Sequence, residues 1–254
     1  MKRDWFLMFV ALVACAGAFF AAWGTALERD ERLRGVADPA TDADLPYWMP
    51  RLGVNADLTE YASDEIADQL DLMRAAGVTW VRQFFSWDAA EAERGVFDWS
   101  RYDAIVAAVA ESAGLRLVAV MNDTPPWAAA ESSSTTGTIP PNVVAFPADP
   151  ADFAAFVRAF AERYGDRIDV YQIWDEPNLT EAWGMGEPRA AAYAALLQAA
   201  YDAIHSADAD AQVIAGALAP TVETGPKNIS DLTFLDDLYR LGLSDFSDGV
   251  AAKP

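Results

Sequence analysis

Two adjacent acids at the end of one apolar stretch are the residues best placed to do chemistry in this sequence. Residues 170–178 read Val-Tyr-Gln-Ile-Trp-Asp-Glu-Pro-Asn, so an apolar β-type run leads into Asp175 and Glu176. Pro177 cannot donate a backbone hydrogen bond and is expected to end the strand, with Glu176 at its carboxyl end. Trp174 would shield that carboxyl group from water, which favours its neutral form. A neutral glutamic acid can act as a general acid, whereas the simpler alternative is a solvated strand end.

Other common catalytic groups are scarce in the chain. The single cysteine, Cys15, lies in the N-terminal apolar run, so the remaining sequence can form no internal disulfide. The single histidine, His205, falls near the end of a predicted helix, and both Ser–His–Asp and Cys–His chemistry would depend on it. The sequence has no cluster of histidines and cysteines at metal-ligand spacing. We therefore predict neither a metal nor a cofactor.

The charge balance limits the kinds of partner. The 254 residues carry a formal net charge of −21, and 53% of them are hydrophobic while 22% are charged. A chain of this length and composition can bury a sizeable core. Its strong negative charge argues against nucleic acid and against an anionic membrane surface, but not against neutral sugars.

The N-terminus has the features of a membrane-targeting segment. Lys2 and Arg3 precede an uncharged run of 19 residues from Trp5 to Trp23. A membrane-spanning helix needs ~20 such residues, so the pattern slightly favours an uncleaved anchor over a cleaved signal peptide. Either interpretation places the protein outside the cytoplasm, membrane-anchored or secreted. The predicted organisation is a signal peptide or transmembrane anchor over residues 1–27, a charged tether over 28–47 and one domain over 48–254.

Strand-like and helix-like patterns alternate through that domain. The predicted strands cover residues 51–55, 78–85, 115–121, 170–176, 212–217 and 249–252. A polar loop is expected after the second strand and a long one over 122–148, and Asp149-Pro150 is a typical helix start. The chain has no glycine-rich nucleotide-binding loop, so the alternation favours a (β/α)8 TIM-barrel type of fold, with about six of its eight units present. In such barrels the chemistry lies at the carboxyl ends of the strands.

Four short motifs occur in a recognisable order. They are Val81-Arg82 with Phe85-Ser86-Trp87, Gly95-Val96-Phe97-Asp98-Trp99 with Tyr102-Asp103, Thr124-Pro125-Pro126-Trp127-Ala128, and Trp174-Asp175-Glu176-Pro177-Asn178. Together they resemble a clan of retaining glycoside hydrolases, (β/α)8-barrel enzymes with catalytic glutamates on strands four and seven, which includes cellulase-like and β-xylosidase-like families. The last motif is the most specific, because it is close to the clan's Trp-Asn-Glu-Pro-Asn.

The resemblance implies a role for each of these positions. Glu176 would be the general acid/base. Six other side chains would contact the substrate or shape its site: Arg82, Trp87, Asn122, Trp127, Asp175 and Asn178. The arginine would hold the nucleophile's carboxylate through a bidentate pair, the tryptophans would stack on sugar rings and the asparagines would line the substrate side. A structural ion pair, core packing and loop capping are the respective alternatives.

Two departures from the clan matter. Asp175 replaces the asparagine that usually bonds the sugar 2-hydroxyl, which changes how that hydroxyl would be recognised. In addition, six predicted strands leave no position for the nucleophile of strand seven, so we expect these six units alone not to hydrolyse glycosides. The expected substrate is a β-linked glycoside or polysaccharide, with membrane contact only through the N-terminal segment.

Two further interpretations are open. A non-catalytic carbohydrate-binding barrel at the cell surface would use the same strand ends without chemistry. A barrel enzyme acting on phosphorylated substrates is disfavoured by the net charge and by the lack of a phosphate-binding glycine loop.

Overall fold

The computed structural model describes residues 5, 14–21, 23–25, 52–130, 145–184 and 186–253, which fall in two units, 1–50 and 51–254. In the first unit, residues 14–21 and 23–25 are helical. Across the described ranges, no helix has both the length and the apolarity that a membrane crossing requires. Much of the predicted anchor, including residues 6–13, lies outside the described residues, and the anchor stays a prediction. The division at residues 27 and 47 stays a prediction.

The second unit is built on one parallel sheet of six strands. Every strand pairs with the next one along the chain, so their order in the sheet is β1-β2-β3-β4-β5-β6. This order has no point at which the winding reverses, as it would in a doubly wound sheet. The prediction of a (β/α) barrel represented by six units is confirmed. The strands are β1 (Gly53–Asn55), β2 (Trp80–Ser86), β3 (Arg116–Asn122), β4 (Val170–Asp175), β5 (Gln212–Leu218) and β6 (Gly249–Ala252).

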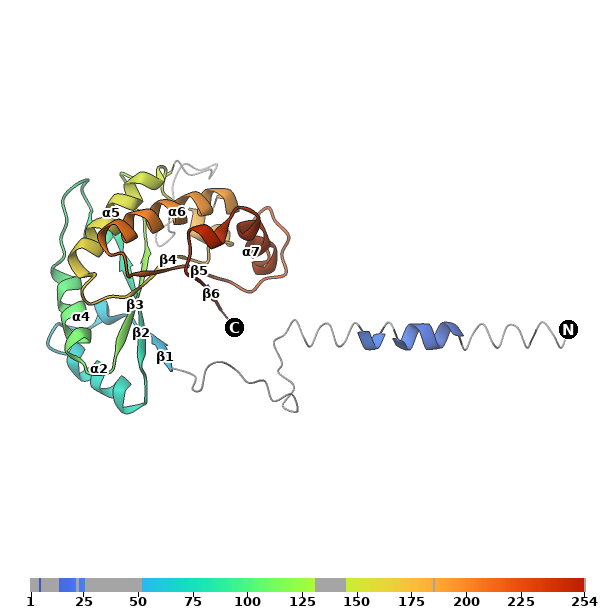
Figure 1. Cartoon of the computed structure of the whole chain (residues 1–254), viewed down its shortest axis with the longest axis horizontal. Coiled ribbons are helices and arrows are strands. Elements are labelled where there is room, and N and C mark those ends of the chain that lie inside the picture. The colour runs from blue at the N-terminus through green and yellow to red at the C-terminus, as the bar shows by residue number, and fades with distance from the viewer. Residues whose placement is uncertain are drawn as a thin grey trace. The chain divides into compact units, whose positions relative to one another are not determined.

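Helices cover the outer side of this sheet. Figure 1 shows α2, α4, α5, α6 and α7 in an arc around the strands. The helix start predicted at Asp149 is present, because its carboxylate accepts the Ala151 N–H at 2.9 Å. One short helix, α3, replaces part of the polar loop predicted after the second strand. The helices are α2 (Ile66–Ala75), α3 (Trp87–Ala90), α4 (Ser100–Glu111), α5 (Pro150–Tyr164), α6 (Ala190–Ala207) and α7 (Asp231–Arg240), with 3-10 turns η1 (Leu58–Glu60), η2 (Thr180–Trp183) and η3 (Leu243–Asp245).

The two faces of β2 show where the core lies and where the site can be. Val81, Gln83 and Phe85 are buried, whereas the alternate residues Arg82, Phe84 and Ser86 are only partly buried. Successive side chains of a strand point to opposite faces, so the buried set packs beneath the helices and the other set faces the inside of the curved sheet. The inner face therefore carries the side chains that can reach a ligand.

An aromatic layer fills the space between β2 and the helices α4 and α5. Its rings contact one another edge-to-face or stacked; Phe85, for example, lies 4.9 Å from Phe160 between ring centroids. Rings in such arrangements add to the stability gained from burial alone. The layer consists of Phe85, Trp87, Trp99, Phe153, Phe156, Phe160 and Tyr164.

Candidate active site

Glu176 follows β4 directly, at the carboxyl edge of the sheet. Its backbone N–H donates to the carbonyl of Ala217 on β5 at 2.9 Å. Two residues at this strand end have positive φ angles, +68° for Trp174 in β4 and +48° for Glu176 just after it. This left-handed conformation is uncommon for residues other than glycine, and such strain clusters at functional sites. The strand end is therefore held in one particular, unfavourable backbone shape.

A buried tyrosine and a glycine maintain that shape. The Tyr193 hydroxyl on α6 donates to the Ile173 carbonyl at 2.9 Å and accepts the Gly216 N–H at 2.6 Å, so it bridges β4 and β5. A Cβ at Gly216 would lie only 2.7 Å from the carbonyl oxygens of Ile173 and Trp174, which no other residue could tolerate. Burial raises the pKa of the Tyr193 hydroxyl, which keeps its donated proton in place.

Two cations and two carboxylates meet beside the strand end. Lys253 donates to Glu176 Oε1 at 2.6 Å and to Asp175 Oδ2 at 3.0 Å. Arg82 Nη2 donates to Asp175 Oδ1 at 2.7 Å, and its Nε donates to Gln172 at 3.0 Å. Burial lowers the pKa of Lys253, but the two carboxylates outweigh burial and the net shift is upward. The structure thus brings three of the predicted site residues together.

Sequence reasoning missed Lys253. The residue is 77 positions from Glu176 and belongs to none of the four motifs, so no local pattern connects the two. The available signal was its position directly after the sixth predicted strand, since residues that follow parallel strands meet at the same edge of a barrel.

A cavity of about 200 Å³ opens at Glu176. Asn122, at the end of β3, lines it and is 8% exposed, and its side-chain oxygen has no hydrogen-bond partner among the described residues. That oxygen is itself shielded from solvent, so the substrate contact expected for this residue stays a prediction. The cavity is lined by Phe84, Asn122, Trp174, Asp175, Glu176, Glu181 and Ala182.

The structure corrects two of the expected substrate contacts. Trp87 has no exposed surface, because its ring stacks on Phe156 and its indole N–H donates to Glu91 Oε2 at 2.6 Å. Asn178 also has no exposed surface; its side chain donates to the carbonyls of Ala219 and Ile229, each at 2.9 Å, and accepts the Ala219 N–H. Both residues therefore serve packing and loop capping in this conformation.

Trp127 lies apart from the cavity at Glu176. Its indole N–H donates to the Glu91 carbonyl at 2.9 Å, and the guanidinium of Arg94 lies over its ring, 4.6 Å from the centroid. The residue does not line the cavity, and a cation occupies one ring face. Stacking of Trp127 on a sugar remains a prediction. Within the described part of the chain, no group of three or more His, Cys, Asp or Glu side chains is placed to hold a metal ion.

A family model described as beta-galactosidase, for glycoside hydrolase family 42, matches residues 59–210. None of the curated proteins with which the chain was compared matches it.

Solved glycosidase structures share the fold. A family 39 glycoside hydrolase from Bacteroides cellulosilyticus WH2 is 19% identical with a TM-score of 0.57, and the match covers 79% of this chain and 37% of that one. A monomeric beta-xylosidase from Caulobacter crescentus CB15 is 20% identical with a TM-score of 0.56, covering 80% and 41%. The exo-beta-1,4-mannosidase Op5Man5 from Opitutaceae bacterium strain TAV5 is 21% identical with a TM-score of 0.50, covering 65% and 31%. The chain thus spans less than half the length of these proteins.

Proposed function

Because this chain belongs to glycoside hydrolase family 42, we propose that the protein hydrolyses β-linked O-glycosidic bonds with retention of configuration. The family description and the names of two of the similar structures specify β-glycosidases, which supports a β-linked substrate. One observation carries the proposal. Glu176 lies at the carboxyl end of a barrel strand, in a cavity and on a strained backbone, where enzymes of this fold place their catalytic groups.

Glu176 would act twice in such a reaction. As an acid it would protonate the oxygen of the departing sugar, and as a base it would then take a proton from the attacking water. In the first step the glycosidic oxygen would replace Lys253 as the hydrogen-bond partner of the protonated acid.

The nucleophile would be a second carboxylate about 5–5.5 Å from Glu176. Asp175 fits this role poorly, because its two oxygens already pair with Arg82 and Lys253. We therefore propose that the nucleophile lies outside the described residues and that Arg82 helps to orient it. The N-terminal apolar run further leads us to propose that the reaction takes place outside the cytoplasm.

The same ion pair also favours a second candidate, a barrel that binds carbohydrate without cleaving it. Lys253 contacts only Oε1 of Glu176, so Oε2 can accept a hydrogen bond from a sugar hydroxyl without any proton transfer. The two candidates differ in whether bond cleavage depends on Glu176.

The test compares Glu176→Gln with the parent in a complete eight-stranded domain that contains residues 51–254. For unactivated β-linked disaccharides, whose leaving groups need protonation, kcat/KM should fall by roughly 10²–10⁴. For dinitrophenyl β-glycosides the first step should be largely spared, and added azide should restore turnover by replacing water in the second step. The exposed Glu162→Gln on α5 is the matched control. Equal, small losses on both substrate types would remove Glu176 from this role.

A further inference from the structure

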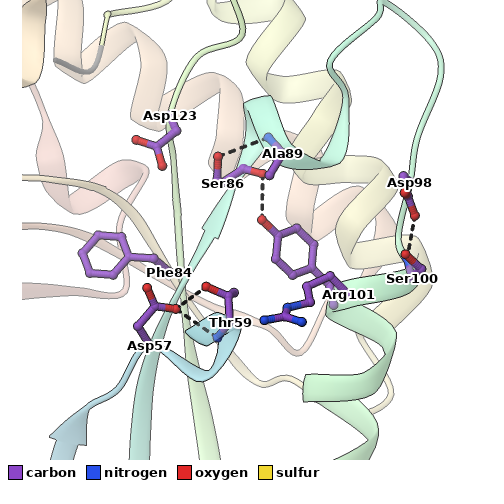
Figure 2. A pocket seen from close by; sticks show the side chains of 10 residues that line it. Asp57, Thr59, Phe84, Ser86, Ala89, Asp98, Ser100, Arg101 and Asp123 are labelled. Atoms are coloured by element: carbon purple, nitrogen blue, oxygen red, sulfur yellow. Dashed lines mark hydrogen bonds between the residues drawn. The ribbon is translucent and has the colours of Figure 1, made fainter. Parts of the chain in front are cut away.

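A second cavity lies beside the first, over the carboxyl ends of β1, β2 and β3. Its volume is about 260 Å³. Figure 2 shows Phe84 between the carboxylates of Asp57 and Asp123, with the side chain of Arg101 directed toward the same space. Asp57 follows β1 and Asp123 follows β3, so these groups reach the same edge of the sheet as Glu176 does after β4.

Phe84 joins the two cavities, because its side chain lines both. The alternate residues Arg82, Phe84 and Ser86 follow one another along the inner face of β2, from the ion pair with Asp175 to the second cavity. The cavities measure about 260 and 200 Å³. Each is smaller than the roughly 300–1,000 Å³ typical of small-molecule sites, whereas together they fall within that range.

The lining of the second cavity suits a sugar ring. The guanidinium of Arg101 makes no hydrogen bond or ion pair with any described residue, and the hydrogen bonds of Asp57 to Thr59 use only one of its carboxylate oxygens. Asp123 is half-buried with φ +63°, and burial raises the pKa of its carboxyl group. Donor and acceptor groups beside an aromatic ring match a ligand that has hydroxyls on its edge and C–H groups on its faces.

Other ligand classes fit less well. An anion such as phosphate would meet three carboxylates, those of Asp57, Asp98 and Asp123, against the single cation Arg101. A metal ion is disfavoured because these carboxylates are not grouped to hold one, as is true of all the described residues. Of the ligand classes considered for this cavity, a neutral polyhydroxylated unit such as a sugar fits best.

We propose that this second cavity binds one sugar unit of a saccharide chain whose neighbouring unit lies at Glu176. The substrate would accordingly be an oligosaccharide or polysaccharide, recognised over at least two units. The inference rests on the proposed function, since that function places the first unit at Glu176.

The test is calorimetric titration of the full 254-residue chain, which requires binding but no turnover. The probes are methyl β-D-galactopyranoside with β-1,4-galactobiose, and methyl β-D-xylopyranoside with xylobiose. In at least one pair the disaccharide should bind about tenfold more tightly than the methyl glycoside, because the second unit gains hydrogen bonds to charged groups. Arg101→Ala should abolish this difference and leave the affinity for the methyl glycoside unchanged. Asp123→Asn, which keeps a residue tolerant of positive φ, should reduce the difference severalfold.

The exposed Arg158→Ala on α5 is the matched control and should change neither affinity. Equal affinities for the two members of both pairs would overturn the inference and leave the proposed function intact, since hydrolysis needs only the unit at Glu176. A loss of affinity for both ligands in Arg101→Ala would overturn it as well. If no saccharide binds, the inference fails, and the hydrolysis experiment on Glu176→Gln then decides the proposed function separately.

Discussion

The aromatic layer beneath α4 and α5 and the strand end at Glu176 are stabilised in different ways. In the aromatic layer, Trp87 contacts three rings with centroid distances of 5.3 to 5.7 Å and makes one side-chain hydrogen bond. At the strand end, Asn178 and Tyr193 instead form five hydrogen bonds to backbone groups. Apolar packing is non-directional, whereas hydrogen bonds fix the geometry of the groups that they join.

The comparison explains why two expected sugar contacts have structural roles. Trp87 fills the core, and Asn178 ties the loop after β4 to the segments after β5 and before α7. Both belong to motifs that resemble catalytic ones. Such motifs therefore include residues that shape the backbone around a site as well as residues that touch its ligand.

The largest expected effect is in the aromatic layer. Trp87→Ala should lower the free energy of unfolding by about 3–5 kcal/mol, because it removes a fully buried ring and leaves a cavity. Chemical denaturation of the chain measures this. Tyr239→Ala, at a side chain that is 58% exposed, is the control and should change stability little. A loss below about 1 kcal/mol for Trp87→Ala would show that the layer is not packed as described.

A somewhat smaller effect is expected at the strand end. Asn178→Ala should cost roughly 2–4 kcal/mol, since it leaves the buried backbone groups of Ala219 and the partly buried carbonyl of Ile229 without partners. The same denaturation experiment applies. If the variant instead kept full stability and lost saccharide affinity, Asn178 would be a ligand contact after all, and the distinction between the two regions would fail.

The smallest expected change in stability concerns an exposed ion pair between α4 and α5, the helices that cover the aromatic layer. Arg163 forms a bidentate ion pair with Asp103, at 2.8 and 2.7 Å, which joins α5 to α4. The pair lowers the pKa of the Asp103 carboxyl group below its ordinary value of 3.8. The contribution of the pair to stability is therefore fully present above pH 3.8 and is lost as the pH falls through the lowered pKa. Because both side chains are about two-fifths exposed, Arg163→Ala should cost only about 0.2–1 kcal/mol at pH 7. The difference from the parent should disappear in acid. A difference that stays constant with pH would mean that the arginine acts through packing.

Local sequence determined much of this protein. The periodicity of apolar residues in strands and helices, and residues such as Pro177 that end these elements, act between neighbours in the sequence. They were enough to predict the six strands in their order. They also placed Glu176 at a strand end and started α5 at Asp149-Pro150. The resemblance carried by four motifs agreed with the family model over residues 59–210.

Tertiary structure decided which side chains meet. Lys253 reaches Glu176 across 77 positions because β4, β5 and β6 pair side by side. Tyr193 reaches Gly216 across 23 positions because α6 lies against β5. The same packing turned Trp87 and Asn178 away from the cavity. A local pattern specifies the chemistry of each side chain and its place along a strand, but the direction in which it points into a site depends on helices and strands distant in the sequence.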